Sequence, residues 1–81
     1  MIYLLTQDHC PKCEQLEKFL EKGLRGKYDD RIERVHRQTN EEQFNQLVAE
    51  HQITATPALI NGDRVLRNPS ISNLVSFLDE D

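Results

Sequence analysis

One stretch near the start of this chain decides its fold: Ile2-Tyr3-Leu4-Leu5-Thr6-Gln7-Asp8-His9-Cys10-Pro11-Lys12-Cys13. Residues 2–6 form a short apolar run of strand formers, which predicts a buried parallel strand. The polar segment 7–9 ends that strand. Pro11 suits the first position of a helix, since its missing N–H is not needed there. The stretch therefore predicts a strand that leads directly into a helix, with Cys10 at the helix start.

The segments that follow extend this alternation. Beyond Cys13, Leu16 and Leu20 continue an apolar stripe at helical spacing until Gly23 and Gly26 end the helix. Residues 32–36 predict a second strand, and Asn40 predicts the capped start of a second helix, followed by acidic first-turn residues. The inner face of that helix is expected to carry Phe44, Leu47, Val48 and His51.

The last third of the chain predicts a hairpin and a closing helix. Two apolar runs, Ala58–Ile60 and Arg64–Leu66, flank Asn61-Gly62-Asp63, and both Asn61 and Gly62 tolerate positive φ. Ser70 can cap a final helix whose apolar residues recur at i, i+3, i+4 and i+7. The order of elements predicts one α/β domain over residues 1–81, with a mixed four-stranded sheet and helices on both of its faces.

Size and charge exclude several classes of function. The chain has 81 residues, 30% of them charged, and a formal net charge of -4, which argues against nucleic-acid binding. No apolar run approaches the roughly 20 residues that a membrane helix needs, and the N-terminus lacks the basic start of a signal peptide. We therefore expect a cytoplasmic protein with no membrane partner, for which a monomer suffices.

Cys10 and Cys13 carry the expected chemistry. Thiol–disulfide exchange needs an exposed thiolate that attacks and a second thiol that resolves the mixed disulfide. Cys10 is expected at the helix start, where free N–H groups and the helix dipole favour a negative sulfur. Cys13 is expected one turn deeper, on the apolar side of the helix. The spacing therefore predicts that Cys10 attacks and that Cys13 resolves.

Two neighbours could modulate the Cys10 thiolate. Lys12 is cationic at neutral pH, and His9 lies directly before the cysteine. A solvent-exposed lysine without a role is an equally good interpretation of Lys12. An ordinary loop residue is the better interpretation of His9, and a proton carrier the alternative.

Other uses of a Cys-x-x-Cys pair stay open. A structural zinc site needs four ligands, and beyond the cysteines the chain offers only His9, His36 and His51, without zinc-site spacing. We therefore predict no metal ligands in one chain, although two chains could share a metal or iron–sulfur cluster. A non-catalytic adaptor is a further alternative.

Pro57, after Thr56, opens a strand, and sequence alone favours a trans bond there.

The order of these motifs resembles that of glutaredoxins and small glutaredoxin-like thioredoxins: Cys10-Pro11-Lys12-Cys13 after the first strand, Thr56-Pro57 before the third, Asn61-Gly62 in the turn, then a closing helix. The resemblance implies a minimal thioredoxin fold and an electron-carrying oxidoreductase whose only cofactor is its own redox-active disulfide. It also implies a cis peptide between Thr56 and Pro57, beside the cysteines. The Thr56 backbone would pair with the extended chain of a protein disulfide substrate, and Pro57 would keep metal away from the thiols.

The chain also departs from these families. It contains no Trp, and Lys12 replaces the usual Tyr of glutaredoxins. Glutathione-binding members carry a Gly-Gly pair before the last helix, where this chain reads Arg67-Asn68-Pro69-Ser70. A close approach of the backbone to glutathione is therefore not expected, although Ser70 could still contact an anion. Of the two possible reductants, we expect a thioredoxin-type reductase rather than glutathione.

Overall fold

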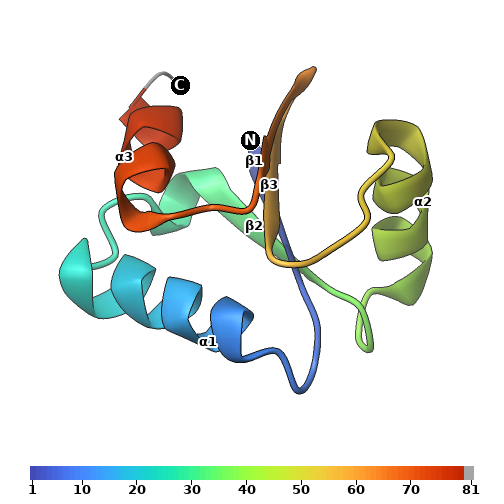
Figure 1. The fold of residues 1–81 in the computed structure, drawn as a ribbon, viewed down its shortest axis with the longest axis horizontal. Helices are drawn as coiled ribbons and strands as arrows, with labels where there is room; N and C mark the ends of the chain where they lie inside the picture. The colour runs from blue at the N-terminus through green and yellow to red at the C-terminus, as the bar shows by residue number, and fades with distance from the viewer. Residues whose placement is uncertain (80–81) are drawn as a thin grey trace.

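The structure is a computed structural model that describes residues 1–79 of the chain. Strands and helices alternate along it in the predicted order (Figure 1). The elements are β1 (Ile2–Thr6), α1 (Pro11–Lys18), η1 (Phe19–Gly23), η2 (Asp29–Arg31), β2 (Ile32–His36), α2 (Glu41–His51), β3 (Ala58–Asn61), β4 (Arg64–Arg67) and α3 (Ile71–Asp79). None of the helices within residues 1–79 is long and apolar enough to cross a membrane.

The four strands form one mixed sheet in the order β2-β1-β3-β4. β1 runs parallel to β2, with Ile2 opposite Ile32, and antiparallel to β3, with Leu4 opposite Leu59. β3 and β4 are antiparallel neighbours joined by a hairpin. The predicted α/β class with a mixed four-stranded sheet is confirmed.

Helices cover both faces of the sheet, as predicted. α1 and α3 lie on one side and α2 lies on the other (Figure 1). The α1–α3 side buries Leu4 and Leu59 of the sheet with Leu20 and Leu74 of the helical segments. The opposite side buries a second set of sheet and helix residues: Leu5, Val35, Phe44, Ile53, Ala58 and Ile60. Because β1 contributes alternate residues to both cores, its sequence is apolar almost throughout.

The structure corrects two local predictions. Asn40 occupies the N-cap position of α2, but its side chain makes no cap hydrogen bond. Its Oδ1 instead accepts from the backbone N–H of His36 at 3.3 Å, because that strand-edge donor has no strand partner on this side. In the hairpin, Asn61 still pairs with Arg64, and among the turn residues only Gly62 has a positive φ, 65°. The loop is thus Gly62-Asp63, the pattern of a type II′ turn.

The first helical segment ends at Gly23, as predicted, but its last turn is not α-helical. Its α-helical part stops at Lys18, and the chain continues as the π-helical turn η1 through Gly23. The backbone N–H of Leu24 closes that turn on the carbonyl of Phe19 at 2.9 Å. Gly26 follows with a positive φ of 69°.

Candidate functional site

Cys10 and Cys13 form a disulfide at the start of α1, with their Cα atoms 5.2 Å apart. Cys10 is the N-cap residue and Pro11 the first helical residue, as the sequence predicts. Both cysteines are largely covered, with 8% of Cys10 and 2% of Cys13 exposed. Cys13 is therefore the deeper of the two, which agrees with the predicted order along the helix.

The side chain of Cys10 caps the helix. The backbone N–H of Cys13 donates to Cys10 Sγ at 3.2 Å, and the N–H of Glu14 donates to the Cys10 carbonyl at 3.1 Å. An N-cap side chain usually supplies oxygen for this bond, and here sulfur takes its place. In the reduced protein the same N–H would point at a thiol or a thiolate. A hydrogen bond and the positive end of the helix both favour the negative form.

The Thr56-Pro57 segment lies beside this sulfur. Cys10 Sγ is 3.8 Å from the carbonyl oxygen of Thr56 and 3.8 Å from its Oγ1, from which the hydroxyl can donate to the sulfur. The Thr56–Pro57 peptide bond is cis, as the resemblance implies, and the trans bond favoured by sequence alone is wrong. Pro57 itself is buried at the start of β3. The structure thus places Cys10 and Cys13 beside Thr56-Pro57, although the two pairs lie far apart in the sequence.

Lys12 and His9 lie at the site without contacting the sulfurs. Both side chains are exposed, and within residues 1–79 neither makes a hydrogen bond or ion pair with Cys10 or Cys13. His9 has a φ of 56°, in the left-handed region that few residues other than glycine adopt. It forms part of the sharp turn between β1 and α1.

That turn is tied to the connection between β2 and α2. The backbone N–H of Asp8 donates to Gln38 Oε1 at 3.0 Å, and Asp8 Oδ1 lies 3.0 Å from His36 Nε2. Arg37 Nη1 donates to Gln7 Oε1 at 3.1 Å. These contacts between two loops fix the backbone that presents Cys10.

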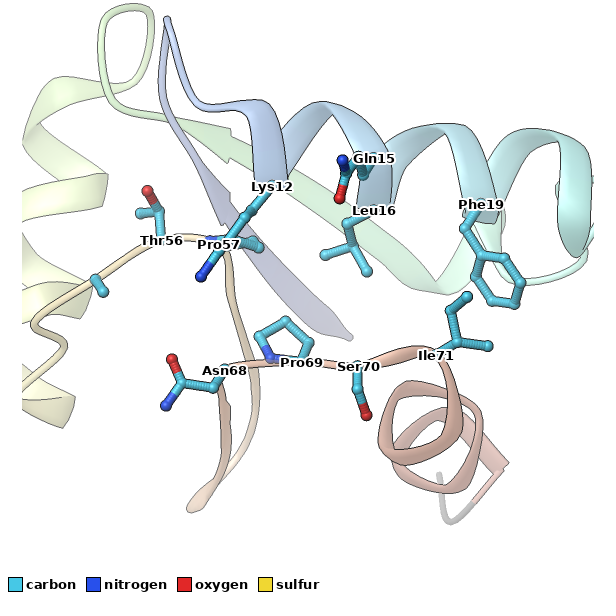
Figure 2. A pocket seen from close by; sticks show the side chains of 11 residues that line it. Lys12, Gln15, Leu16, Phe19, Thr56, Pro57, Asn68, Pro69, Ser70 and Ile71 are labelled. Carbon is cyan, nitrogen blue, oxygen red and sulfur yellow. The ribbon is translucent and has the colours of Figure 1, made fainter.

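A groove of about 360 Å³ begins at Thr56 and Pro57 and runs between α1 and the start of α3 (Figure 2). Its far end lies between Phe19 and Ile71, and Figure 2 shows these two side chains reaching toward each other from opposite walls. Sequence reasoning did not identify these groove residues as part of a site. The spacing of Lys12, Gln15, Leu16 and Phe19 along one helix face is the signal that could have found one wall. The complete lining is Lys12, Gln15, Leu16, Phe19, Ala55, Thr56, Pro57, Asn68, Pro69, Ser70 and Ile71.

The N-terminus of α3, on the other wall, is already capped. The backbone N–H of Asn73 donates to Ser70 Oγ at 3.4 Å, and the N–H of Ser70 donates to Asn73 Oδ1 at 2.5 Å. Ser70 therefore caps its helix as predicted. The reciprocal arrangement occupies two of the donors that an anion at this helix start would use.

The three histidines are dispersed. His36 pairs with Asp8, His51 lies 3.9 Å from Glu50, and His9 points to solvent. In the part of the chain that the structure describes, no three or more His, Cys, Asp or Glu side chains gather as metal ligands would. Comparisons of the chain with models of protein families, with curated proteins and with solved structures found no match.

Proposed function

We propose that this chain is a dithiol–disulfide oxidoreductase with a minimal thioredoxin fold, and that it reduces disulfides in partner proteins. One observation carries the proposal: Cys10 Sγ, at the tip of α1, accepts the backbone N–H of Cys13 at 3.2 Å. A sulfur held in this way is stabilised as a thiolate, which is the nucleophile of thiol–disulfide exchange. Cys13, within disulfide distance and more deeply buried, supplies the second thiol.

The reaction takes place in two exchanges. The Cys10 thiolate attacks one sulfur of the partner disulfide, forms a mixed disulfide, and expels the partner's other sulfur as a thiolate that takes up a proton. Cys13 then loses its proton, and its sulfur attacks Cys10 Sγ. This forms the Cys10–Cys13 disulfide and releases the second partner sulfur, which is also protonated. The partner gains two electrons, which the two cysteines lose, and two protons, one from Cys13 and one from the solvent that took up the Cys10 proton on ionisation.

Thr56 and Pro57 are proposed to dock the partner. An extended segment that carries the target cysteine would add as a strand along the Thr56 backbone, an interaction independent of its side chains. The distance of 3.8 Å between Cys10 Sγ and the Thr56 carbonyl supports this role, because a docked sulfur would lie next to the attacking one. The cis bond and the buried Pro57 are the arrangement that the resemblance implies for this ledge.

A reductant must then return two electrons to the disulfide. We propose a thioredoxin-type reductase rather than glutathione. The capping of α3 by Ser70 and Asn73 supports this choice, because those donors are engaged within the chain. The missing Gly-Gly pair at Asn68-Pro69 supports it as well. The proposed setting is the cytoplasm, where reduced thiols are maintained, and the proposed form is a monomer.

The test is the reduction of a protein disulfide, such as those of insulin, by the reduced chain and two variants. Cys10→Ser is expected to abolish reduction, since no nucleophile remains. Cys13→Ser is expected to stop after the first exchange, with a covalent adduct between Cys10 and the substrate that mass measurement detects. Full activity of Cys10→Ser would contradict the proposal and favour an adaptor. A purified protein that contains stoichiometric iron or zinc would favour the shared-cluster alternative.

A further inference from the structure

The end of the groove farthest from the disulfide is apolar and exposed. Ile71 is 63% exposed, and among residues 1–79 only Met1 is a comparably exposed large apolar residue. Ile71 shares the groove end with Phe19, which packs only partly against the core. An apolar pair of this kind at the end of a groove, rather than scattered on the surface, favours a binding role.

Phe19 can occupy this position because residue 23, outside the groove, is a glycine. A Cβ placed on Gly23 would lie 2.6 Å from Cδ1 and 2.8 Å from Cε1 of the Phe19 ring. The ring therefore rests directly against the Gly23 backbone, across the π-helical turn η1. Any side chain at position 23 would force the ring to move. The absence of a side chain there fixes one wall of the groove end.

The two ends of the groove differ in charge. Lys12, near the disulfide, is the single charged residue among those that line it. The far end offers only the Phe19 ring and the Ile71 side chain as large contact surfaces (Figure 2). An occupant that fits both ends is neutral or acidic near its cysteine and apolar farther along.

The distance from Cys10 to the far end of the groove exceeds the reach of glutathione. Phe19 follows Cys10 by nine helical positions, about 13 Å at the rise of a helix. An extended peptide covers that distance in about four residues. Glutathione extends a single residue to either side of its cysteine and ends well before Phe19. A segment of a protein chain reaches it.

We infer that the groove selects protein disulfides in which a large apolar residue stands about four residues from the reactive cysteine, and that this side chain fills the space between Phe19 and Ile71. The inference rests on the proposed function and adds the class of substrate. The segment pairs first with the Thr56 backbone and then runs along α1 to the groove end. Burial of a leucine-sized side chain there raises kcat/KM about tenfold or more over a serine.

The test uses four peptides, each joined through one cysteine to the same small thiol by a disulfide. Two carry Leu or Ser four residues before the cysteine, and two carry Leu or Ser four residues after it. The measured quantity is the Leu-to-Ser ratio of kcat/KM for each protein, so that any loss of folded protein cancels. Wild-type protein is expected to show a ratio of about ten or more on one side of the cysteine.

Four variants locate the preference. Ile71→Ser is expected to bring the ratio close to one, and Ile71→Leu to preserve it. Gly23→Ala is expected to lower it as well, although position 23 lies outside the groove, because the added methyl group displaces the Phe19 ring. Val75→Ser is the matched control, since it removes an apolar side chain one turn along α3, outside the groove, and should leave the ratio unchanged.

The outcomes separate this inference from the proposed function. If wild-type protein reduces all four peptides at equal rates, the apolar selection is wrong and the oxidoreductase stands. A wild-type ratio that survives both Ile71→Ser and Gly23→Ala also overturns the selection. If wild-type protein reduces none of the peptides and no protein disulfide, the proposed function itself fails.

Discussion

Besides the Thr56 hydroxyl, two groups could influence the charge state of Cys10: the backbone N–H of Cys13 and the ammonium group of Lys12. The N–H lies 3.2 Å from Sγ, whereas the Lys12 side chain is exposed and has no partner within residues 1–79. Water and salt screen an exposed charge strongly. The backbone donor is therefore the larger influence, and it belongs to the helix rather than to any side chain.

This difference gives a prediction for Lys12→Ala. The rate at which the reduced protein reacts with an alkylating reagent at neutral pH should fall by a factor of about five at most, the range of an exposed charge pair. Lys18→Ala, another exposed lysine of α1, is the control and should change the rate less. A fall of about a hundredfold for Lys12→Ala alone would show that the lysine, not the helix start, holds the thiolate.

The sequence predicted Cys10 and Cys13 as site residues because both lie within one turn of the same helix. It could not establish the cis bond at Pro57, since the choice between cis and trans depends on residues that are distant in the chain. The family resemblance implied it, and the structure confirms it. Phe19 and Ile71 were missed as site residues for a related reason. Each fits an apolar stripe, and only the fold brings them to one groove.

Among the elements, α2 is stabilised at its C-terminal end by a residue from another element. Arg67, on the edge strand β4, donates from Nη2 to the carbonyl of His51 at 2.8 Å and from Nη1 to that of Gln52 at 3.0 Å. Gln52 has a φ of 54°, the left-handed conformation common at helix ends. One guanidinium thus satisfies two carbonyls at the negative end of the helix.

Arg67→Ala is expected to lower the free energy of unfolding by about 1 kcal/mol, as the loss of partly exposed charged hydrogen bonds does. Arg67→Lys should retain part of this stability, because a lysine reaches the carbonyls without the planar fork. Chemical denaturation followed by circular dichroism measures both. Lys22→Ala, at another exposed basic residue, is the control. Equal stability of Arg67→Ala and wild type would contradict the capping role.

The turn of the β3–β4 hairpin contains a glycine at position 62. Gly62 has a φ of 65°, and a Cβ added there would meet nothing within 4 Å. Gly62→Ala should therefore cost about 1 kcal/mol through the backbone alone, while Gly62→Asn should cost less, because Asn tolerates this conformation. Thermal unfolding of the two variants distinguishes them. Equal costs would point to a steric cause instead.

The elements themselves could be predicted, and so could several of their ends, since the bounds predicted for the first two strands are those of β1 and β2. Hydrophobic spacing located every strand and helix that the sequence analysis expected. Asn40 failed as a side-chain cap because the N–H of His36, from the neighbouring strand, competes for its oxygen. α1 ends at Lys18, where the chain continues as a π-helical turn that no local sequence pattern predicted. The donor that takes the Asn40 oxygen comes from outside its helix, whereas the π-helical turn is closed locally by the N–H of Leu24 on the carbonyl of Phe19.

For the whole molecule, the buried Cys10–Cys13 disulfide lies at the edge of the two hydrophobic cores. Neither core includes Cys10 or Cys13, which lie at the start of α1. The disulfide closes a very short loop, so it restrains the unfolded chain little, by about 2 kcal/mol at most. A site at the edge of the cores can change its oxidation state without repacking them.

Reduction should accordingly leave the fold intact. We expect the free energies of unfolding of the oxidised and reduced proteins to agree within about 2 kcal/mol, with the same far-ultraviolet circular dichroism. Denaturation with and without a thiol reductant makes the comparison, and the double variant Cys10→Ser and Cys13→Ser serves as its control. Cooperative unfolding upon reduction would show that the disulfide is a structural staple.

The mixed sheet and the two-sided core could be predicted from the order of elements, because a parallel strand pair requires a crossover helix. The apolar character of β1 on both faces already implied layers on both sides. The loop contacts that hold the Cys10 turn, such as Asp8 with His36, could not be predicted. They join two segments whose proximity exists only after the sheet has formed.

Competitive alkylation of the reduced protein tests directly whether Cys10 carries the reactive thiolate. A reagent such as iodoacetamide, added in less than stoichiometric amount at neutral pH, is followed by peptide mapping of the two cysteines. We predict that the label lies almost entirely on Cys10, because its sulfur accepts a hydrogen bond from the Cys13 N–H and lies nearer the surface. Equal labelling of both cysteines, or preferential labelling of Cys13, would contradict it.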